Sequence, residues 1–212
     1  MLSSAAQSRL TIMSGLPSTL TPVESGDHDH LDPLADLVFV STTVLRQALD
    51  LVTDILTDDD QLTKQSKSLP GSTIGKHLRH ARDHFILLLD CIGGDGPYVF
   101  SYDTRSRNTP MESSLSKARI ALADAISQVK AVAPLAKLDQ PMTLNAITPF
   151  PQTFETTFGR ELWFAGLHAV HHWSMIRVIA SEQGIMLPDD FGFAPSTLVH
   201  KGSDAPLGKA KI

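Results

Sequence analysis

The segment His168–Arg177, with the sequence HAVHHWSMIR, places three histidines within a largely apolar run. Apolar residues from 157 to 184 fall on every face of a helix, a pattern typical of a buried helix. At about 100° per residue, His168 and His172 lie about 40° apart and one turn apart, which is how a helix commonly offers two ligands to one metal ion. His171 is turned about 100° away from His172, so we expect it to point elsewhere.

A second group of histidines, His77, His80 and His84, lies in residues 72–92, STIGKHLRHARDHFILLLDCI. All three follow one border of the apolar stripe of this predicted helix, and on periodicity alone any of them could reach inward. Buried imidazoles need partners, and a pair on one helix facing a third on its neighbour is best explained by a shared metal ion. Three neutral imidazoles leave one position open on zinc, which is typical of catalytic sites.

Two carboxylates accompany the histidines. Glu161 lies two turns before His168 on the same stripe, where it could orient a ligand or a substrate, although an ion pair with Arg160 or a charge at the favourable N-terminal end of the helix explains it equally well. Asp83 could accept the second N–H of a ligating imidazole. Residue 169 is alanine, so the pattern is not the H-E-x-x-H of zinc peptidases, and no P-C-x-x-C of a zinc deaminase is present. Histidines bonded only to one another remain the alternative to a metal site.

The rest of the chain indicates a helical bundle. Caps and apolar periodicity predict four helices over about 33–57, 72–92, 110–133 and 157–184. Residues 96–108, GPYVFSYDTRSRN, lack a helical period and predict an ordered loop. Three prolines and alternating threonines over 139–157 predict a long connection containing a short hairpin. Four helices with a long crossover between the third and the fourth are typical of an all-α four-helix bundle, whose core commonly holds metal sites.

Length and composition limit the domain organisation, the kinds of partner and the cellular location that we expect. The 212 residues suit one domain, predicted over 31–198, with a disordered tail over 1–30 and a flexible tail over 199–212. A net charge of −5 without a basic run argues against nucleic acid as a partner. No apolar run suits a membrane span or a secretory signal, so we expect a cytoplasmic protein, with a mitochondrial transit peptide as the minor alternative. A single cysteine, Cys91, excludes an internal disulfide.

The stretches TIGKHLRHARDHF and ELWFAGLHAVHHWSMI resemble the DinB/YfiT-like superfamily. The resemblance implies an up-down-down-up four-helix bundle with a metal ion held by three histidines. It assigns two of these ligands to His168 and His172, and it places the ligand of the second helix on His80. His77 and His84 then become neighbours of the site, and His171 matches an additional histidine that is frequent in the family.

A subgroup of uncharacterised DinB-like proteins is more similar still, over roughly residues 33 to 198. The shared features are SYDTRSRN, FGRELWF and FGFAPSTL, and the first of these contains Tyr102, Asp103, Arg105 and Arg107. Some members of the superfamily transfer or use low-molecular-weight thiols. The two arginines could therefore bind the carboxylates of such a thiol, or they could pin the loop to Asp103.

The favoured function is a metal-dependent enzyme with a small-molecule substrate. In this hypothesis His80, His168 and His172 bind a divalent ion, with zinc favoured over nickel or iron, which activates a thiol for transfer or, second, water for hydrolysis. Glu161 and His171 are the acid/base candidates. The alternatives are a non-catalytic metal or ligand binder, whose site is closed by a fourth protein ligand such as His84 or Glu161, and a structural bundle that forms a homodimer.

Overall fold

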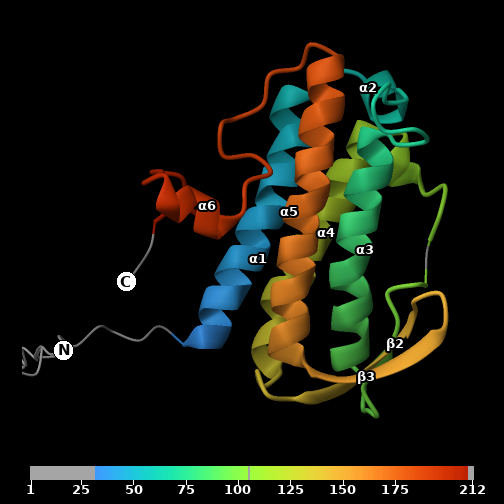
Figure 1. Cartoon of the computed structure of the whole chain (residues 1–212), viewed down its shortest axis with the longest axis vertical. Coiled ribbons are helices and arrows are strands. Elements are labelled where there is room, and N and C mark those ends of the chain that lie inside the picture. Colours follow the sequence, from blue (N-terminus) through green and yellow to red (C-terminus); the bar gives the residue numbers. More distant parts are fainter. Residues whose placement is uncertain (1–31, 105, 210–212) are drawn as a thin grey trace, which may run out of the picture. The chain divides into compact units, whose positions relative to one another are not determined.

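The computed structural model describes residues 32–104 and 106–209 of the chain, and this part is mostly helical (Figure 1). Its helices are α1 (Pro33–Asp50), α2 (Asp60–Thr63), α3 (Ile74–Ile92), α4 (Leu115–Val132), α5 (Phe158–Glu182) and α6 (Pro195–His200). A π-helical turn, Leu51–Ile55, continues α1, and two 3-10 turns span Pro110–Glu112 and Ala133–Leu135. Its strands are β1 (Val99–Phe100), β2 (Pro141–Ile147) and β3 (Pro151–Thr157). Three predictions fall outside the described residues: Arg105, the tail over 1–30 and the last three residues of the tail over 199–212.

Side-chain caps explain where three of the long helices begin. Asp32 accepts a hydrogen bond from the backbone N–H of Leu34 at 3.0 Å, and Pro33 occupies the first position of α1. Thr157 caps α5 in the same way, as the sequence predicts. The cap of α3 is Thr73 rather than the adjacent Ser72, since the Thr73 hydroxyl accepts from the backbone of the first turn.

The fourth long helix, α4, begins later than predicted. The Glu112 carboxylate accepts from the Thr109 backbone N–H at 3.3 Å, which is one half of a capping box, but this contact opens only the 3-10 turn at Pro110–Glu112. Helix α4 starts at Leu115, whose N–H donates to a carboxylate oxygen of Asp59 at 2.7 Å. Local sequence patterns cannot reveal a cap that comes from a distant part of the chain. The helix was therefore predicted to begin at residue 110, next to Thr109.

Two short helices were also missed. The four predicted helices leave out residues 58–71, which contain α2, and the residues after 184, which contain α6. Pro195 at the first position of α6 was the available signal. Residues 201–209 form turns after α6, and Leu207 among them is buried against the hydrophobic core.

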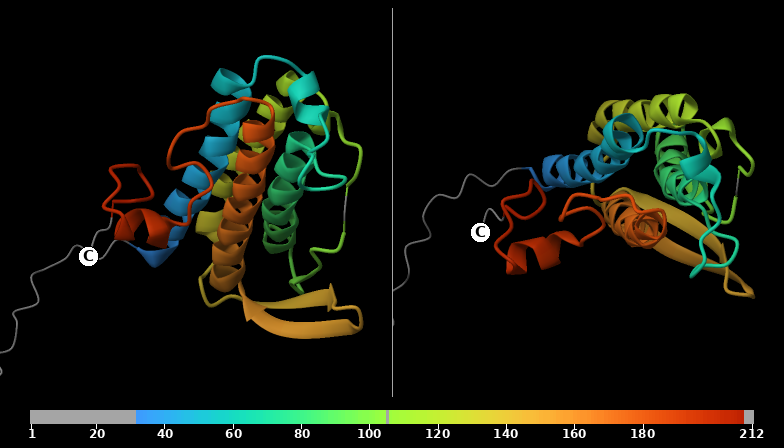
Figure 2. Two further views of the ribbon diagram at one scale, coloured as in Figure 1. Left: turned by 45° about the horizontal axis from the view of Figure 1, so that its top comes forward. Right: turned by 90° about the horizontal axis from the view of Figure 1, so that it is seen from above.

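Each of the four long helices packs against two of the others: α1 and α3 both contact α4 and α5 (Figure 2). Trp173 of α5 is fully buried, and its indole N–H donates to the Val44 carbonyl of α1 at 2.9 Å. Much of α5 is therefore buried as predicted, but not on every face, since Trp163, Leu167 and Val178 are 52%, 42% and 40% exposed. No helix of the described part is long and apolar enough to cross a membrane.

A small sheet lies where α3 ends and α5 begins (Figure 1). Strands β2 and β3 form an antiparallel hairpin from the pair Pro141–Thr157 to the pair Ile147–Pro151, and β1 joins β2 in parallel. The hairpin anticipated within 139–157 is therefore present and longer than expected. Because of this sheet, the all-α expectation is corrected to a mostly helical fold.

Candidate metal centre

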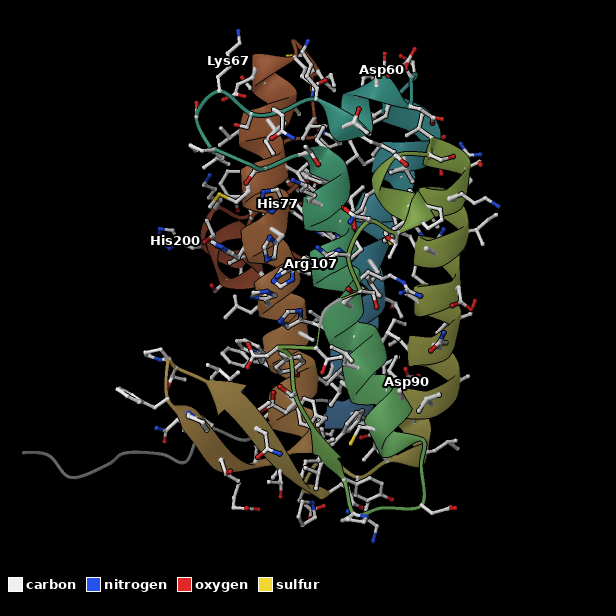
Figure 3. The ribbon with its side chains drawn as sticks, turned by 90° about the vertical axis from the view of Figure 1, so that its right-hand side faces the viewer. Asp60, Lys67, His77, Asp90, Arg107 and His200 are labelled. Atoms are coloured by element: carbon white, nitrogen blue, oxygen red, sulfur yellow. The ribbon has the colours of Figure 1, made fainter. Side chains whose placement is uncertain are left out.

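Helices α3 and α5 bring the two histidine groups together along one seam, and Figure 3 shows His77 where these helices face one another. The ring nitrogens that His80, His84 and His168 can offer to a metal all lie within 4.8 Å of one another. His84 is almost completely buried, and the other two are partly exposed. The described residues thus contain a three-histidine cluster compatible with a metal ion.

His168 is at the centre of this seam. Its Nε2 atom lies 3.2 Å from Nε2 of His80 and 3.1 Å from Nε2 of His172. Two nitrogen ligands of one tetrahedral zinc ion, each about 2.0–2.1 Å from the metal, lie about 3.3 Å apart. Both separations are therefore close to those of ligands that share an ion.

His77 contacts the other ring nitrogen of His172, Nδ1. The Nδ1 atoms of the two rings are 2.7 Å apart, so one must donate and the other accept. If His172 donates, its Nε2 carries the lone pair that points towards His168, which is the tautomer that a metal ligand needs. Nε2 of His77 is buried and has no hydrogen-bond partner within the described part of the chain.

The tautomer of His84 follows from its partner. Nδ1 of His84 lies 3.0 Å from the carbonyl oxygen of His80, and a carbonyl only accepts, so Nδ1 carries the proton. Nε2 is then the atom that could bind a metal, an arrangement common among metal-ligating histidines. The ring of Tyr102 stacks on His84 with centroids 4.5 Å apart and planes at 14°.

Tyr102 in turn is fixed by Glu161, which is fully buried. One Glu161 oxygen accepts from the Tyr102 hydroxyl at 3.0 Å, and the other accepts from Thr156 at 2.7 Å and from Arg160 at 2.8 Å. Burial, followed by the Glu161 charge, raises the pKa of Tyr102 well above its ordinary value, so the phenol stays protonated. The ion pair between Glu161 and Arg160, which the sequence offered as one explanation of Glu161, is present. The hydrogen bond from Thr156 was not predicted, because no local motif marks it.

None of the three remaining described residues of the predicted site, Asp83, Arg107 and His171, is among the candidate metal ligands. Asp83 forms ion pairs with Arg79 at 3.3 Å and Arg82 at 3.5 Å. Burial raises its pKa, and the two arginines lower it by a smaller amount. Arg107 is exposed, in the loop that passes the outer side of α3 (Figure 3). His171 lies on α5 and lines a groove described below.

Burial keeps two of these imidazoles neutral. It lowers the pKa of His77 to about 4, with a smaller contribution from His171. It also lowers the pKa of His172 to about 2, where the neighbouring His168, His80, His77 and His171 add to the effect. Neutral imidazole is the form that binds a metal ion, so His172 is in the appropriate state near pH 7, and neutral His77 can accept the His172 N–H.

We expect acid to destabilise the metal-free protein through these two histidines. Below about pH 6.5 the unfolded chain protonates them, but the folded chain does not until about pH 4 for His77 and about pH 2 for His172. The unfolded state then binds more protons, so the free energy of unfolding falls as the pH drops from 6.5 towards 4. Urea denaturation at several pH values, compared with a His77→Phe/His172→Phe variant, measures this. An equally steep decline in that variant would contradict the assignment.

The sequence has relatives among known proteins. A curated protein of Rhizopus delemar, FK506-binding protein 5, is 30% identical over an alignment of 188 residues that covers 84% of this chain and 42% of that protein. The chain thus spans less than half of the length of this relative. No solved structure matches the chain. The family model of the DinB superfamily matches residues 42–176, which include α3, α4 and the metal-site part of α5. Because that match covers more than half of its 212 residues, the chain belongs to the DinB superfamily.

Proposed function

We propose that this chain binds one divalent metal ion through Nε2 of His80, His168 and His172. The observation that carries the proposal is the spacing of 3.2 Å and 3.1 Å from the central His168 atom to its two neighbours. Zinc is favoured, because three imidazoles leave it one open position. The site would lie in an up-down-down-up four-helix bundle of the DinB/YfiT type.

A second ligand set shares two members with the first. His84 replaces His172 in the cluster of ring nitrogens within 4.8 Å, and its Nε2 has the tautomer required for binding. If His84 joins the three proposed ligands, four imidazoles close the sphere of a zinc ion and the protein becomes a metal binder without an open position. The stacked Tyr102 ring restrains His84 in its present place within this cluster, so the open site requires that His84 stays uncoordinated.

The open site would serve an enzyme acting on a small molecule. A bound zinc ion lowers the pKa of a coordinated thiol or water and so supplies a nucleophile near neutral pH. Thiol transfer is favoured over hydrolysis on the resemblance to thiol-using relatives. Glu161 holds Tyr102 against His84, and His171 remains the acid/base candidate closest in sequence to a ligand. The net charge of −5 makes nucleic acid an unexpected partner.

Cobalt substitution tests whether the site is open to a thiol. We expect the visible spectrum of the cobalt(II) protein to gain a sulfur-to-cobalt charge-transfer band when a small thiol is added, because the thiolate enters the fourth position. A His171→Phe variant should show the same band, since this residue is not a proposed ligand. A spectrum that does not respond to thiols would rule out thiol chemistry and would support the closed site with His84.

A further inference from the structure

A groove of about 500 Å³ lies on the other side of α5 from the histidine seam, towards α6. Its apolar walls come from Leu167 and Val170 of α5 and from Phe193 and Ala194, which precede α6. In Figures 1 and 2, α6 lies on the side of α5 opposite to α3. We call this feature the α6 groove. The proposed metal ligands of α5 face α3 instead, although His171, the acid/base candidate beside His172, lines the groove.

The outer wall of the α6 groove is firmly fixed to α5. Ser174 donates to the carbonyl of Gly192 at 2.6 Å, and Arg177 donates to the carbonyls of Phe191 and Pro188. Gly192 has a φ of +74°, and a Cβ there would lie 2.8 Å from the Ser174 backbone nitrogen. Only glycine fits this position, so the wall is built around a close approach to α5. The groove is therefore preformed, as small-molecule sites usually are.

Two cations lie against the Phe193 wall. The Lys201 ammonium is 4.2 Å and the Arg177 guanidinium 5.3 Å from the centre of the Phe193 ring. Neither forms an ion pair with a carboxylate anywhere in the described part of the chain, although the whole chain carries a net charge of −5. The N–H groups of Arg177 donate to backbone carbonyls instead, and these neutral acceptors do not compensate its charge. The groove thus combines apolar walls with one lining cation, Arg177, and with Lys201 on the Phe193 ring, while Asp189 and Asp190 belong to the wall segment between Pro188 and Phe191.

We propose that the α6 groove binds a small amphipathic carboxylate such as a medium-chain aliphatic acid. The chain of the ligand packs on Leu167, Val170 and Phe193, and its carboxylate lies near Lys201 and Arg177. Leu167 is 42% exposed, so a ligand gains by covering it. The volume lies within the range of small-molecule sites.

Calorimetric titration with octanoate tests this site. We expect octanoate to bind at one site with a Kd below about 1 mM, and octan-1-ol and acetate to bind at least about tenfold more weakly, because each lacks one half of the interaction. Lys201→Gln should weaken octanoate binding about tenfold, since it removes a charge from the head-group end. Equal binding of octanoate and octan-1-ol, or no binding of octanoate, would overturn the proposal.

A matched pair of variants locates the ligand. Leu167→Glu places a negative charge in the apolar wall and should weaken octanoate binding more than about tenfold. Val178→Glu is the control, because Val178 lies on the same helix with a similar exposure of 40% but does not line the groove. Equal affinities of the two variants would contradict the location. His168→Ala should bind octanoate as the wild type does, so this outcome is independent of the metal.

Discussion

We expect the His168→Ala protein to lose its metal ion. His168 belongs to both candidate ligand sets, and its Nε2 is within 3.2 Å of Nε2 of His80 and of His172. Zinc binding worth about 10–16 kcal/mol, divided among four ligands, assigns roughly 3 kcal/mol to each, so the affinity should fall on the order of a hundredfold or more. Elemental analysis of untagged protein after dialysis against a weak chelator should find about one equivalent in the wild type and almost none in the variant.

The control for this measurement is His200→Ala. His200 lies at the end of α6 and is exposed, so its removal changes the histidine count without touching the seam. We expect this variant to retain its metal. Wild-type protein without stoichiometric metal, or equal metal in the two variants, would exclude both ligand sets and would leave a structural bundle with mutually bonded histidines.

Two further variants distinguish the ligand sets from each other. Under the proposed set, His172→Ala loses the metal and His84→Ala keeps it. Under the alternative, the two results are exchanged, because the cluster within 4.8 Å contains His84 and not His172. Loss in both variants would indicate a four-histidine sphere. Circular dichroism of each variant shows whether the helices are retained.

The sequence predicted the long helices because their determinants are local. Asp32 and Thr157 stand next to the helices that they cap, and the apolar character of α5 is a property of its own residues. The start of α4 was wrong for the opposite reason, since its cap, Asp59, comes from a segment far away in the chain. Local patterns therefore predict elements well where the stabilising contact is also local.

For the candidate site, the sequence predicted which face of a helix carries the histidines but not which of them lie closest together. The spacing of His168 and His172 places both on one side of α5, and the structure has both next to α3. Periodicity does not give the rotation of α3 about its axis, so it could not rank His77, His80 and His84. The structure shows that all three contact histidines of α5. The α6 groove was not predictable, since its outer wall comes from a segment with no regular pattern.

The second large effect is expected on substitution of His77, which is not a metal ligand in the proposed set. His77→Phe keeps a ring of similar size but removes the Nδ1 atom that lies 2.7 Å from Nδ1 of His172. Loss of such a partner of a metal-ligating histidine typically costs about 10–100-fold in metal affinity. We expect a reduction of this size in a chelator-competition titration with zinc. His77→Asn should recover part of it, because the amide oxygen can accept the His172 N–H.

The matched control for His77 is His171→Phe. The His171 ring is also close to His172, with centroids 5.2 Å apart, yet no hydrogen bond joins the two among the described residues. Its substitution should change zinc affinity less than about twofold, because it leaves the tautomer of His172 unaltered. If His77→Phe and His171→Phe bind zinc equally, the contact of His77 with His172 only fills space. If His77→Phe alone weakens binding and His77→Asn restores it, the hydrogen bond itself selects the metal-binding tautomer of His172.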